Sequence, residues 1–451
     1  MTRLSLLAIA FLLVPAGSAA QEVPPASDLR IYDIIAAASP DRLEADIRTL
    51  AGFGTRNTLS DTLSDTRGIG AARRWIKDEM DRISAACGGC MEVYFQGAVQ
   101  QGGRLPDPVN VVNVVGVIRG TVHPNRYVIM SGDIDSRNSS GSDAEGDAPG
   151  ANDNASGMAG VIEAARILTQ YRFPTSVVLV GLSGEEQGLW GGQHMARVAK
   201  DEGWDIAGVL NNDMIGNIEG VDGVIDNSTF RVFSEPYPRT ATEQELRSYR
   251  TFGGEVDGPS RQLARYVDRI TETYFTNLDA IMIYRLDRFG RGGHHRPFND
   301  QGFAGVRIME THENYVRQHQ NIRTEDGVAY GDVVEGVDFD YAARLTAVNA
   351  AVLASLAWAP PAPLNVLVGG AVQPSTTLAW DAVDDPGLAG YRVYWRDTTA
   401  PQWQHSRFVG SVTEFVLEGM VIDNYLFGVA AVGRDGNESL VSFPSGQLRR
   451  R

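Results

Sequence analysis

Ser176-Val-Val-Leu-Val-Gly-Leu-Ser-Gly-Glu-Glu186 is the most informative segment of the sequence. Its first seven residues are mostly apolar and have the length and composition of a buried strand. Ser183-Gly184 then signals a turn, and two adjacent acids follow at once. An ordinary surface loop rarely places two carboxylates directly behind a buried strand in a glycine-rich turn. We therefore expect a buried strand whose carboxyl end carries chemistry.

The same arrangement recurs along the chain. The apolar run 127–130 precedes Asp133 and Asp135, and the run 206–210 precedes Asp213. Further strands are predicted at 109–118, 280–284 and 305–309, and helical patterns at 68–86, 155–170, 188–200, 256–275 and 338–357. Strands that alternate with helices predict a three-layer α/β/α sandwich around a mainly parallel, mixed sheet.

The composition changes at Trp358-Ala-Pro-Pro-Ala-Pro363, which predicts a linker between an α/β domain over 21–357 and a second domain over 364–451. Beyond the linker there is no helical periodicity. Short strand patterns recur instead, at 376–380, 390–396, 414–417 and 425–432. They predict an all-β sandwich. The positions of Trp380 and of Tyr391-Arg-Val-Tyr-Trp395 make this part resemble a fibronectin type III domain.

The first 20 residues have the composition of a secretory signal peptide. Arg3 precedes the apolar run Leu4–Val14, and small residues end at Ala20. This pattern predicts cleavage near Ala20 and export to the periplasm or the exterior, without a stable membrane anchor. In an exported chain, Cys87-Gly-Gly-Cys90 indicates a local structural disulfide or two inert thiols.

The chain is strongly acidic, with a formal net charge of −16 at pH 7. A nucleic-acid-binding protein needs cations that replace the counterions of the phosphate backbone. The charge therefore argues against nucleic acid as a partner. It leaves open that part of the acidity is concentrated in one site.

Acidic residues follow three of the predicted strands. Because the carboxyl ends of parallel strands meet at one edge of a sheet, these acids are expected to crowd together. Crowded carboxylates repel, and divalent cations relieve the repulsion. Carboxylates combined with imidazole suit zinc or a similar metal. The acids concerned are Asp133, Asp135, Glu185, Glu186 and Asp213, together with Asp153 in a polar loop that opens a helix.

Three ordered motifs resemble those of the co-catalytic zinc exopeptidases. They are Gly150-Ala-Asn-Asp-Asn-Ala-Ser-Gly157, Ser183-Gly-Glu-Glu-Gln-Gly-Leu-Trp190 and Asn212-Asp-Met-Ile-Gly216. That family includes secreted leucyl-type aminopeptidases, glutamate carboxypeptidase and glutaminyl cyclase. The resemblance covers about residues 40–357 and implies two divalent metal ions, expected to be zinc.

The resemblance also implies roles for individual residues. Asp153 would bridge the two ions, with Glu186 on the first ion and Asp213 on the second. Glu185 would be the catalytic general base. The last ligand would be His319, and its rival is His295, in a Gly293-His-His-Arg-Pro-Phe298 segment that looks like the family's substrate-side segment.

One position departs from the family. Where the family has His-x-Asp, this chain has Asp133-Ile134-Asp135, so Asp133 would be the metal ligand in place of histidine and Asp135 would support it. A carboxylate can bind zinc but adds negative charge. The second site could thus hold zinc, manganese or cobalt, or be weak or empty.

The implied function is that of a secreted metal-dependent aminopeptidase acting on peptides with a free N-terminus. Three alternatives stay open. A carboxypeptidase or dipeptidase would use basic residues in the pocket, and four arginines cluster near the substrate-side segment: Arg285, Arg288, Arg291 and Arg296. The other two are a glutaminyl cyclase and an inactive metal-binding module. In each case the C-terminal domain could contact a surface or polymer.

Overall fold

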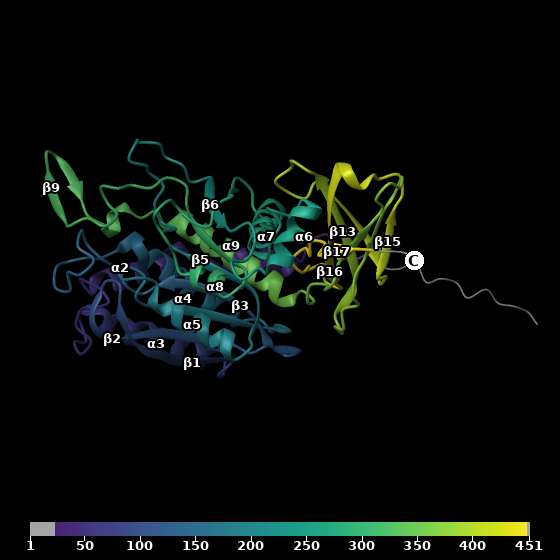
Figure 1. The fold of residues 1–451 in the computed structure, drawn as a ribbon. Helices are drawn as coiled ribbons and strands as arrows, with labels where there is room; N and C mark the ends of the chain where they lie inside the picture. Colours follow the sequence, from purple (N-terminus) through teal and green to yellow (C-terminus); the bar gives the residue numbers. More distant parts are fainter. Residues whose placement is uncertain (1–22, 449–451) are drawn as a thin grey trace, which may run out of the picture.

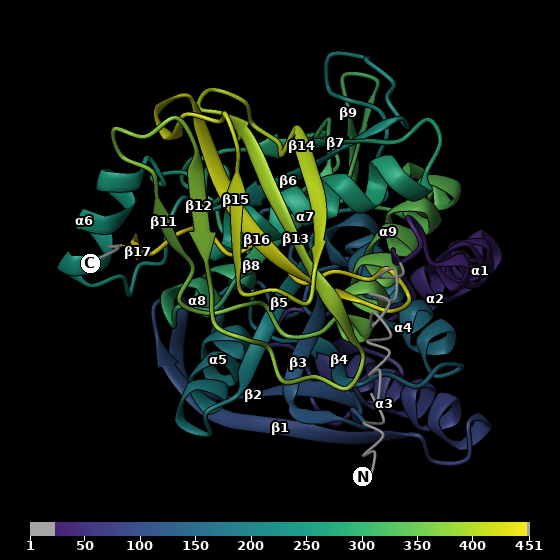
Figure 2. The ribbon, with the colours of Figure 1, turned by 90° about the vertical axis from the view of Figure 1, so that its right-hand side faces the viewer.

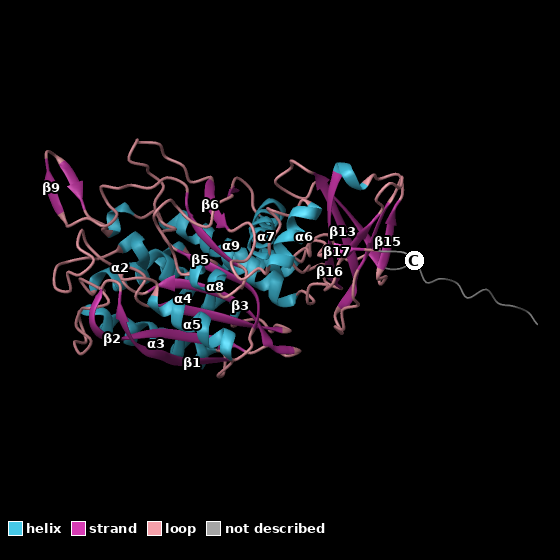
Figure 3. Cartoon of the chain, viewed as in Figure 1, coloured by secondary structure: helices cyan, strands magenta, loops and turns pink. Residues whose placement is uncertain are grey.

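The computed structural model describes residues 23–448, so the predicted signal segment lies outside them. The chain forms a larger α/β part and, at one end of it, a smaller part built from strands (Figures 1 and 2). Coloured by secondary structure, the smaller part is almost entirely strand, whereas helices and strands are interleaved in the larger one (Figure 3). The predicted α/β class with a C-terminal β-sandwich is confirmed.

An eight-stranded mixed sheet forms the centre of the larger part, in the order β1-β2-β4-β3-β5-β8-β6-β7. The four middle strands β4, β3, β5 and β8 run parallel, and β1, β2 and β6 are antiparallel to a neighbour. The strands are β1 Met91–Gly102, β2 Leu105–Ile118, β3 His123–Asp133, β4 Thr175–Leu182, β5 Asp205–Asn212, β6 Thr229–Ser234, β7 Asp279–Ile283 and β8 Gly305–Glu310.

Helices cover both faces of this sheet. Val177 and Leu179 of β4 pack into the core with α1, α2, α3, α4, α7 and α9, whereas Val178 and Val180 pack into the core with α5 and α8. Alternate residues of a strand point to opposite faces, so the apolar run of β4 is buried on both sides. The helices are α1 Leu29–Ala37, α2 Pro40–Gly52, α3 Gly68–Ala86, α4 Gly157–Leu168, α5 Trp190–Asp201, α6 Glu243–Phe252, α7 Pro259–Tyr274, α8 His295–Asp300 and α9 Phe339–Trp358.

Smaller features complete this part. A two-stranded hairpin of β9 Arg323–Glu325 and β10 Val328–Tyr330 stands apart from the main sheet (Figure 1). Cys87 and Cys90 form a disulfide after α3. Across residues 23–448, no helix combines the length and apolar character needed to cross a membrane.

The C-terminal strands form two sheets, of order β15-β12-β11-β17 and β14-β13-β16. Trp380, Tyr391 and Val429 belong to one apolar cluster that draws side chains from both sheets. The fibronectin type III assignment and the exact domain boundaries stay predictions. The strands are β11 Leu367–Gly369, β12 Thr376–Ala379, β13 Leu388–Asp397, β14 His405–Gly410, β15 Glu414–Leu417, β16 Tyr425–Gly433 and β17 Gly446–Gln447.

Candidate metal centre

Three side chains from distant parts of the chain meet at the carboxyl edge of the sheet. His319 Nε2 lies 2.8 Å from Oε1 of Glu186 and 2.9 Å from Oδ2 of Asp153. One ligand atom of each residue lies within 4.8 Å of the others. Two carboxylates and an imidazole are a donor set that zinc accepts, with a fourth position left open. The set therefore fits the first ion that the sequence predicted, and it includes His319 as expected.

The local field at this cluster also suits a cation. Burial by itself lowers the pKa of His319, but the carboxylates of Glu186 and Asp153 outweigh this and raise the pKa to about 10. A positive charge is thus strongly favoured at the point where the three side chains meet. A divalent ion bound there would satisfy the same two carboxylates.

The backbone of the Asp153 segment is held by a residue that the sequence analysis missed. Asp153 lies in the turn Ala151–Ser156 between β3 and α4, and its peptide bond to Asn154 is cis. The Asp332 carboxylate accepts the backbone N–H groups of Asn152 and Asp153, at 2.8 and 2.7 Å. No local pattern marks Asp332, because it lies 179 residues further along the chain.

Asp135 was expected to support Asp133 at the second ion, but it supports the turn that carries Glu185 and Glu186 instead. Its two carboxylate oxygens accept the backbone N–H groups of Glu185 and Glu186, at 3.1 and 3.0 Å, and Thr58 donates a further hydrogen bond. Asp135 is buried. It therefore orients the turn after β4 that carries both glutamates.

Glu185 borders the open cavity next to the cluster without belonging to it. Burial, then the negative charges of Glu186 and Asp213, raise the pKa of Glu185 well above its usual value. A carboxylate with raised proton affinity is suited to accept a proton from water and to return it.

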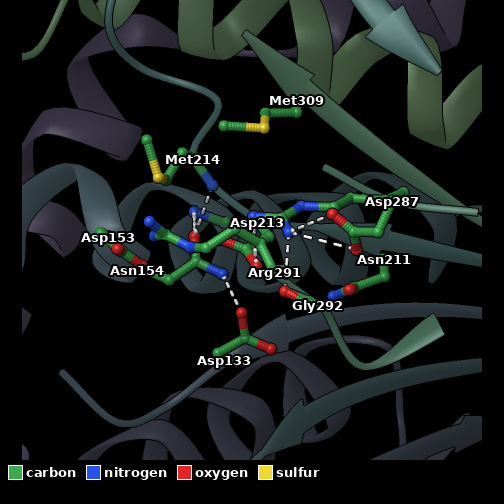
Figure 4. A network of polar contacts seen from close by, with 12 residues as sticks. Asp133, Asp153, Asn154, Asn211, Asp213, Met214, Asp287, Arg291, Gly292 and Met309 are labelled. Carbon is green, nitrogen blue, oxygen red and sulfur yellow. Dashed lines mark hydrogen bonds and ion pairs between the residues drawn. The ribbon is translucent and has the colours of Figure 1, made fainter. Parts of the chain in front are cut away.

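The residues expected at the second ion are engaged differently. Oδ1 of Asp133 lies 2.6 Å from Nδ1 of His294. Its Oδ2 accepts from Nδ2 of Asn154 at 2.6 Å (Figure 4). Oδ2 of Asp213 lies 2.7 Å from Nη2 of Arg307. Within residues 23–448, neither Asp133 nor Asp213 belongs to a cluster with metal-ligand geometry.

Arg307 is another residue of this site that the sequence analysis missed. It is fully buried in β8, and besides Asp213 it contacts Asp287 at 3.1 Å and the carbonyl oxygen of Gly292 at 2.7 Å. A charged residue inside the otherwise apolar run 305–309 was the available signal. The donors therefore fit an ion at Asp153, Glu186 and His319, and they do not fit a second ion equally well.

His295 is not placed on the substrate side. It is buried, and its Nε2 lies 2.8 Å from the carbonyl oxygen of Leu286 and 3.5 Å from Oδ2 of Asp287. It does not border the cavity. Its neighbour His294, the residue before α8, contacts Asp133 instead.

An open cavity of about 560 Å³ lies over the cluster. Arg288, Arg291 and Arg296 border it as the sequence suggested, whereas Arg285 does not. Arg104 and Arg137 also border it, although nothing in the sequence had placed them there. The complete lining is Gly103, Arg104, Arg137, Asp153, Glu185, Glu186, Gln187, Gly188, Leu189, Asp213, Arg288, Gly290, Arg291, Gly292, Arg296, Gln318 and His319.

Comparison with solved structures supports the fold. The Legionella pneumophila LapA aminopeptidase superposes with a TM-score of 0.54 at 18% identity, covering 75% of this chain and 78% of that one. An aminopeptidase from Aneurinibacillus sp. strain AM-1 gives 0.50 at 11% identity, covering 73% and 96%. At these identities the likeness concerns the fold alone.

Comparison of sequences extends over nearly the whole chain. A protein of Pyrenophora teres f. teres named "Probable zinc metalloprotease" is 40% identical, covering 95% of this chain and 90% of its own length. A relative of the same description from Leptosphaeria maculans is 41% identical, covering 94% and 98%. Residues 113–331, which hold all the residues of the cluster, match the profile of Peptidase family M28. The chain belongs to peptidase family M28.

Proposed function

We propose that this chain is a zinc-dependent exopeptidase that removes N-terminal residues from peptides. The observation that carries the proposal is the cluster of Asp153, Glu186 and His319 on the floor of an open cavity, with Glu185 beside it. The relatives named as zinc metalloproteases support both the metal and the reaction class. The intact cluster argues against the alternative of an inactive metal-binding module.

The catalytic roles follow from these positions. A zinc ion bound at the cluster would polarise the scissile carbonyl and lower the pKa of a water molecule. Glu185 takes the proton from the attacking water and passes it to the leaving amine. Asp135 fixes the positions of Glu185 and Glu186 by accepting hydrogen bonds from their backbone N–H groups.

The carboxylates that border the cavity favour a substrate with a free amino terminus. Asp153, Glu185 and Asp213 all face this space, and an α-ammonium group is attracted to such a concentration of negative charge. An acetylated N-terminus carries no charge and loses this attraction. This supports aminopeptidase action as the first candidate.

We further infer that one ion is held firmly and that the second position is weak or empty. The sequence resemblance implied two ions. The contact of Asp213 with Arg307, and those of Asp133 with His294 and Asn154, occupy two of the three side chains that a second ion would need.

Carboxypeptidase or dipeptidase action is the second candidate. The observation that favours it is the set of arginines bordering the cavity, since guanidinium groups bind carboxylates, including the C-terminal one. Glutaminyl cyclase action would use the same cluster of Asp153, Glu186 and His319. It differs in releasing ammonia without cutting a peptide bond.

The test is the release of amino acids from unblocked and N-acetylated peptides by zinc-loaded protein, with a chelator arm. We expect chelator-sensitive release from unblocked peptides only, and loss of release in Glu185→Gln. Equal cleavage of acetylated peptides would replace the aminopeptidase by a carboxypeptidase or endopeptidase. Ammonia release from N-terminal glutamine without cleavage would identify a cyclase.

Export and the role of the second domain belong to the same proposal. N-terminal sequencing of protein recovered outside the cytoplasm tests cleavage near Ala20. We propose that residues 364–451 form a separate domain that packs on the catalytic part and is available for contact with a surface or polymer. A pull-down on insoluble polymers with and without this segment tests the contact.

A further inference from the structure

The cavity over the cluster has carboxylates on its floor, but arginines also border it, in a chain with net charge −16. Five arginines border it: Arg104, Arg137, Arg288, Arg291 and Arg296. Among the residues that border it, Leu189 is the one large apolar side chain, and none is Phe, Tyr or Trp. A cavity with this lining offers little apolar surface to a leucine or phenylalanine side chain.

Three of these arginines differ from the other two in forming no ion pair with the described residues. Arg288 pairs with the Glu313 carboxylate, and Arg137 lies 3.8 Å from Oε2 of Glu186. By contrast, no ion pair found within residues 23–448 includes Arg104, Arg291 or Arg296. Their positive charges are therefore available to a ligand.

Two of the three side chains are fixed in place by neutral groups. Nη1 of Arg104 donates to the carbonyl oxygen of Glu186 at 2.8 Å, and Nη1 of Arg296 donates to the carbonyl oxygen of Arg291 at 3.1 Å. Such bonds hold a guanidinium without cancelling its charge. The side chains are thus oriented beforehand, which lowers the entropy cost of binding an anion.

The three arginines come from two segments of the chain. Arg104 lies at the tip of the hairpin between β1 and β2, beside Gly103. Arg291 and Arg296 lie in the loop after β7 and in the first turn of α8. A Cβ atom on Gly292 would lie 3.0 Å from Nη1 of Arg296, so this loop packs closely.

We propose that Arg104, Arg291 and Arg296 bind a carboxylate of the peptide substrate, so that the enzyme prefers anionic peptides. The inference rests on the proposed exopeptidase function and adds its substrate class. The planar guanidinium fork matches a carboxylate and binds it through paired hydrogen bonds. A positive wall also raises the local concentration of anionic substrates.

The carboxylate has two possible sources. It is either the side chain of an N-terminal Asp or Glu, or the free C-terminus of a short peptide. Two matched pairs separate them: Glu-Ala amide against Gln-Ala amide for the side chain, and Leu-Ala against Leu-Ala amide for the terminus. In one pair we expect the carboxylate form to have a kcat/KM roughly 10–100-fold higher, as for a charged hydrogen bond.

Variants locate the effect. Arg104→Met, Arg291→Met and Arg296→Met keep the aliphatic stem and remove the charge. For the preferred peptide we expect a raised KM with a smaller change in kcat, and a kcat/KM ratio between the paired peptides that falls toward one. Arg247→Met is the matched control, because Arg247 is exposed on α6, pairs with Glu243 and does not border the cavity. It should leave the ratio unchanged.

The outcomes separate this inference from the function on which it rests. Equal cleavage within both pairs overturns the carboxylate preference and leaves the exopeptidase standing. No cleavage of any of the four peptides removes the proposed function instead. In that case calorimetric titration of the same four peptides into Glu185→Gln decides the inference. A lower Kd for a carboxylate form supports it, and equal Kd values within both pairs overturn it.

Discussion

Nη2 of Arg307 lies 2.7 Å from Oδ2 of Asp213, and both side chains are buried. The guanidinium thus brings a fixed positive charge to the carboxylate that the sequence resemblance gave to a second metal ion. A carboxylate shared with a guanidinium binds an added cation more weakly, because the two positive charges repel at short range. Arg307 also lies 3.1 Å from Asp287, so its single positive charge is shared by two carboxylates.

The first prediction concerns metal content. We expect wild-type protein to retain a single zinc ion per chain after exhaustive dialysis, measured by elemental analysis. His319→Ala should lose that ion, because it removes one of three ligands, whereas Asp213→Asn should keep it. Two tightly retained ions in the wild type, reduced to one in Asp213→Asn, would show that Arg307 does not weaken the second position.

The second prediction separates catalysis from metal binding. Glu185→Gln should lower kcat by roughly 10²–10⁴-fold, because a positioned general base contributes about this much. Zinc content should stay near that of the wild type, since Glu185 is outside the ligand cluster. Glu272→Gln is the control, on an exposed position of α7. Turnover at the wild-type rate in Glu185→Gln would remove the general-base role.

The third prediction tests the support beneath the two glutamates. Asp135→Asn keeps one acceptor oxygen and turns an amide N–H₂ toward the other backbone N–H. We expect zinc affinity or activity to fall about 10–100-fold, as for other partners that orient metal ligands. Thr58→Val removes only the hydroxyl bond to Asp135 and should have a smaller effect. Zinc titration with a competing chelator and steady-state kinetics measure both.

The sequence predicts the parts of this centre that have local patterns. Asp153, Glu186 and Asp213 each follow a strand or open a helix inside a short motif, so their positions could be read from the chain. His319 required the resemblance, because the chain offers His295 within a similar distance of the motifs. Only the folded structure distinguishes the two histidines, since His295 contacts the Leu286 carbonyl oxygen whereas His319 contacts Glu186 and Asp153.

Residues that act through packing could not be predicted in this way. Asp332, His294 and Arg307 reach the site by contacts with residues 161, 179 and 94 positions away, and neither spacing nor periodicity reports such contacts. The same holds for Arg104, which is brought to the cavity by a hairpin whose first strand the sequence analysis did not identify. The positions of these residues depend on contacts between distant parts of the folded chain.

The fourth prediction concerns pH and stability. Burial raises the pKa of Glu235 from 4.5 to about 7, and Asn299 donates a hydrogen bond to it. Between these two pH values the native state holds this proton and the unfolded state has lost it. Stability should therefore fall as pH rises from about 4.5 to 7, by roughly 3 kcal/mol in total.

Glu235→Gln should remove this loss. Urea unfolding should give similar free energies for variant and wild type near pH 4.5, and a higher one for the variant, by roughly 3 kcal/mol, at pH 8. Glu243→Gln is the control, because Glu243 is almost fully exposed on α6. If the free energy of unfolding changes with pH in the same way in Glu235→Gln and wild type, then Glu235 ionises in the native state with little loss of stability.

The last prediction concerns the contact between the two parts of the chain. Asp257, ahead of α7, contacts Nη1 of Arg265 at 2.7 Å and Nη2 of Arg396 in β13 at 2.8 Å, and all three side chains are almost fully buried. Asp257→Asn leaves two buried guanidinium groups without a counter-charge, so we expect a loss of about 3–5 kcal/mol, seen as a lower unfolding midpoint. Adding Arg396→Met should recover part of this loss, because it removes one unpaired charge. An unchanged midpoint in Asp257→Asn would show that this ion-pair network does not stabilise the contact.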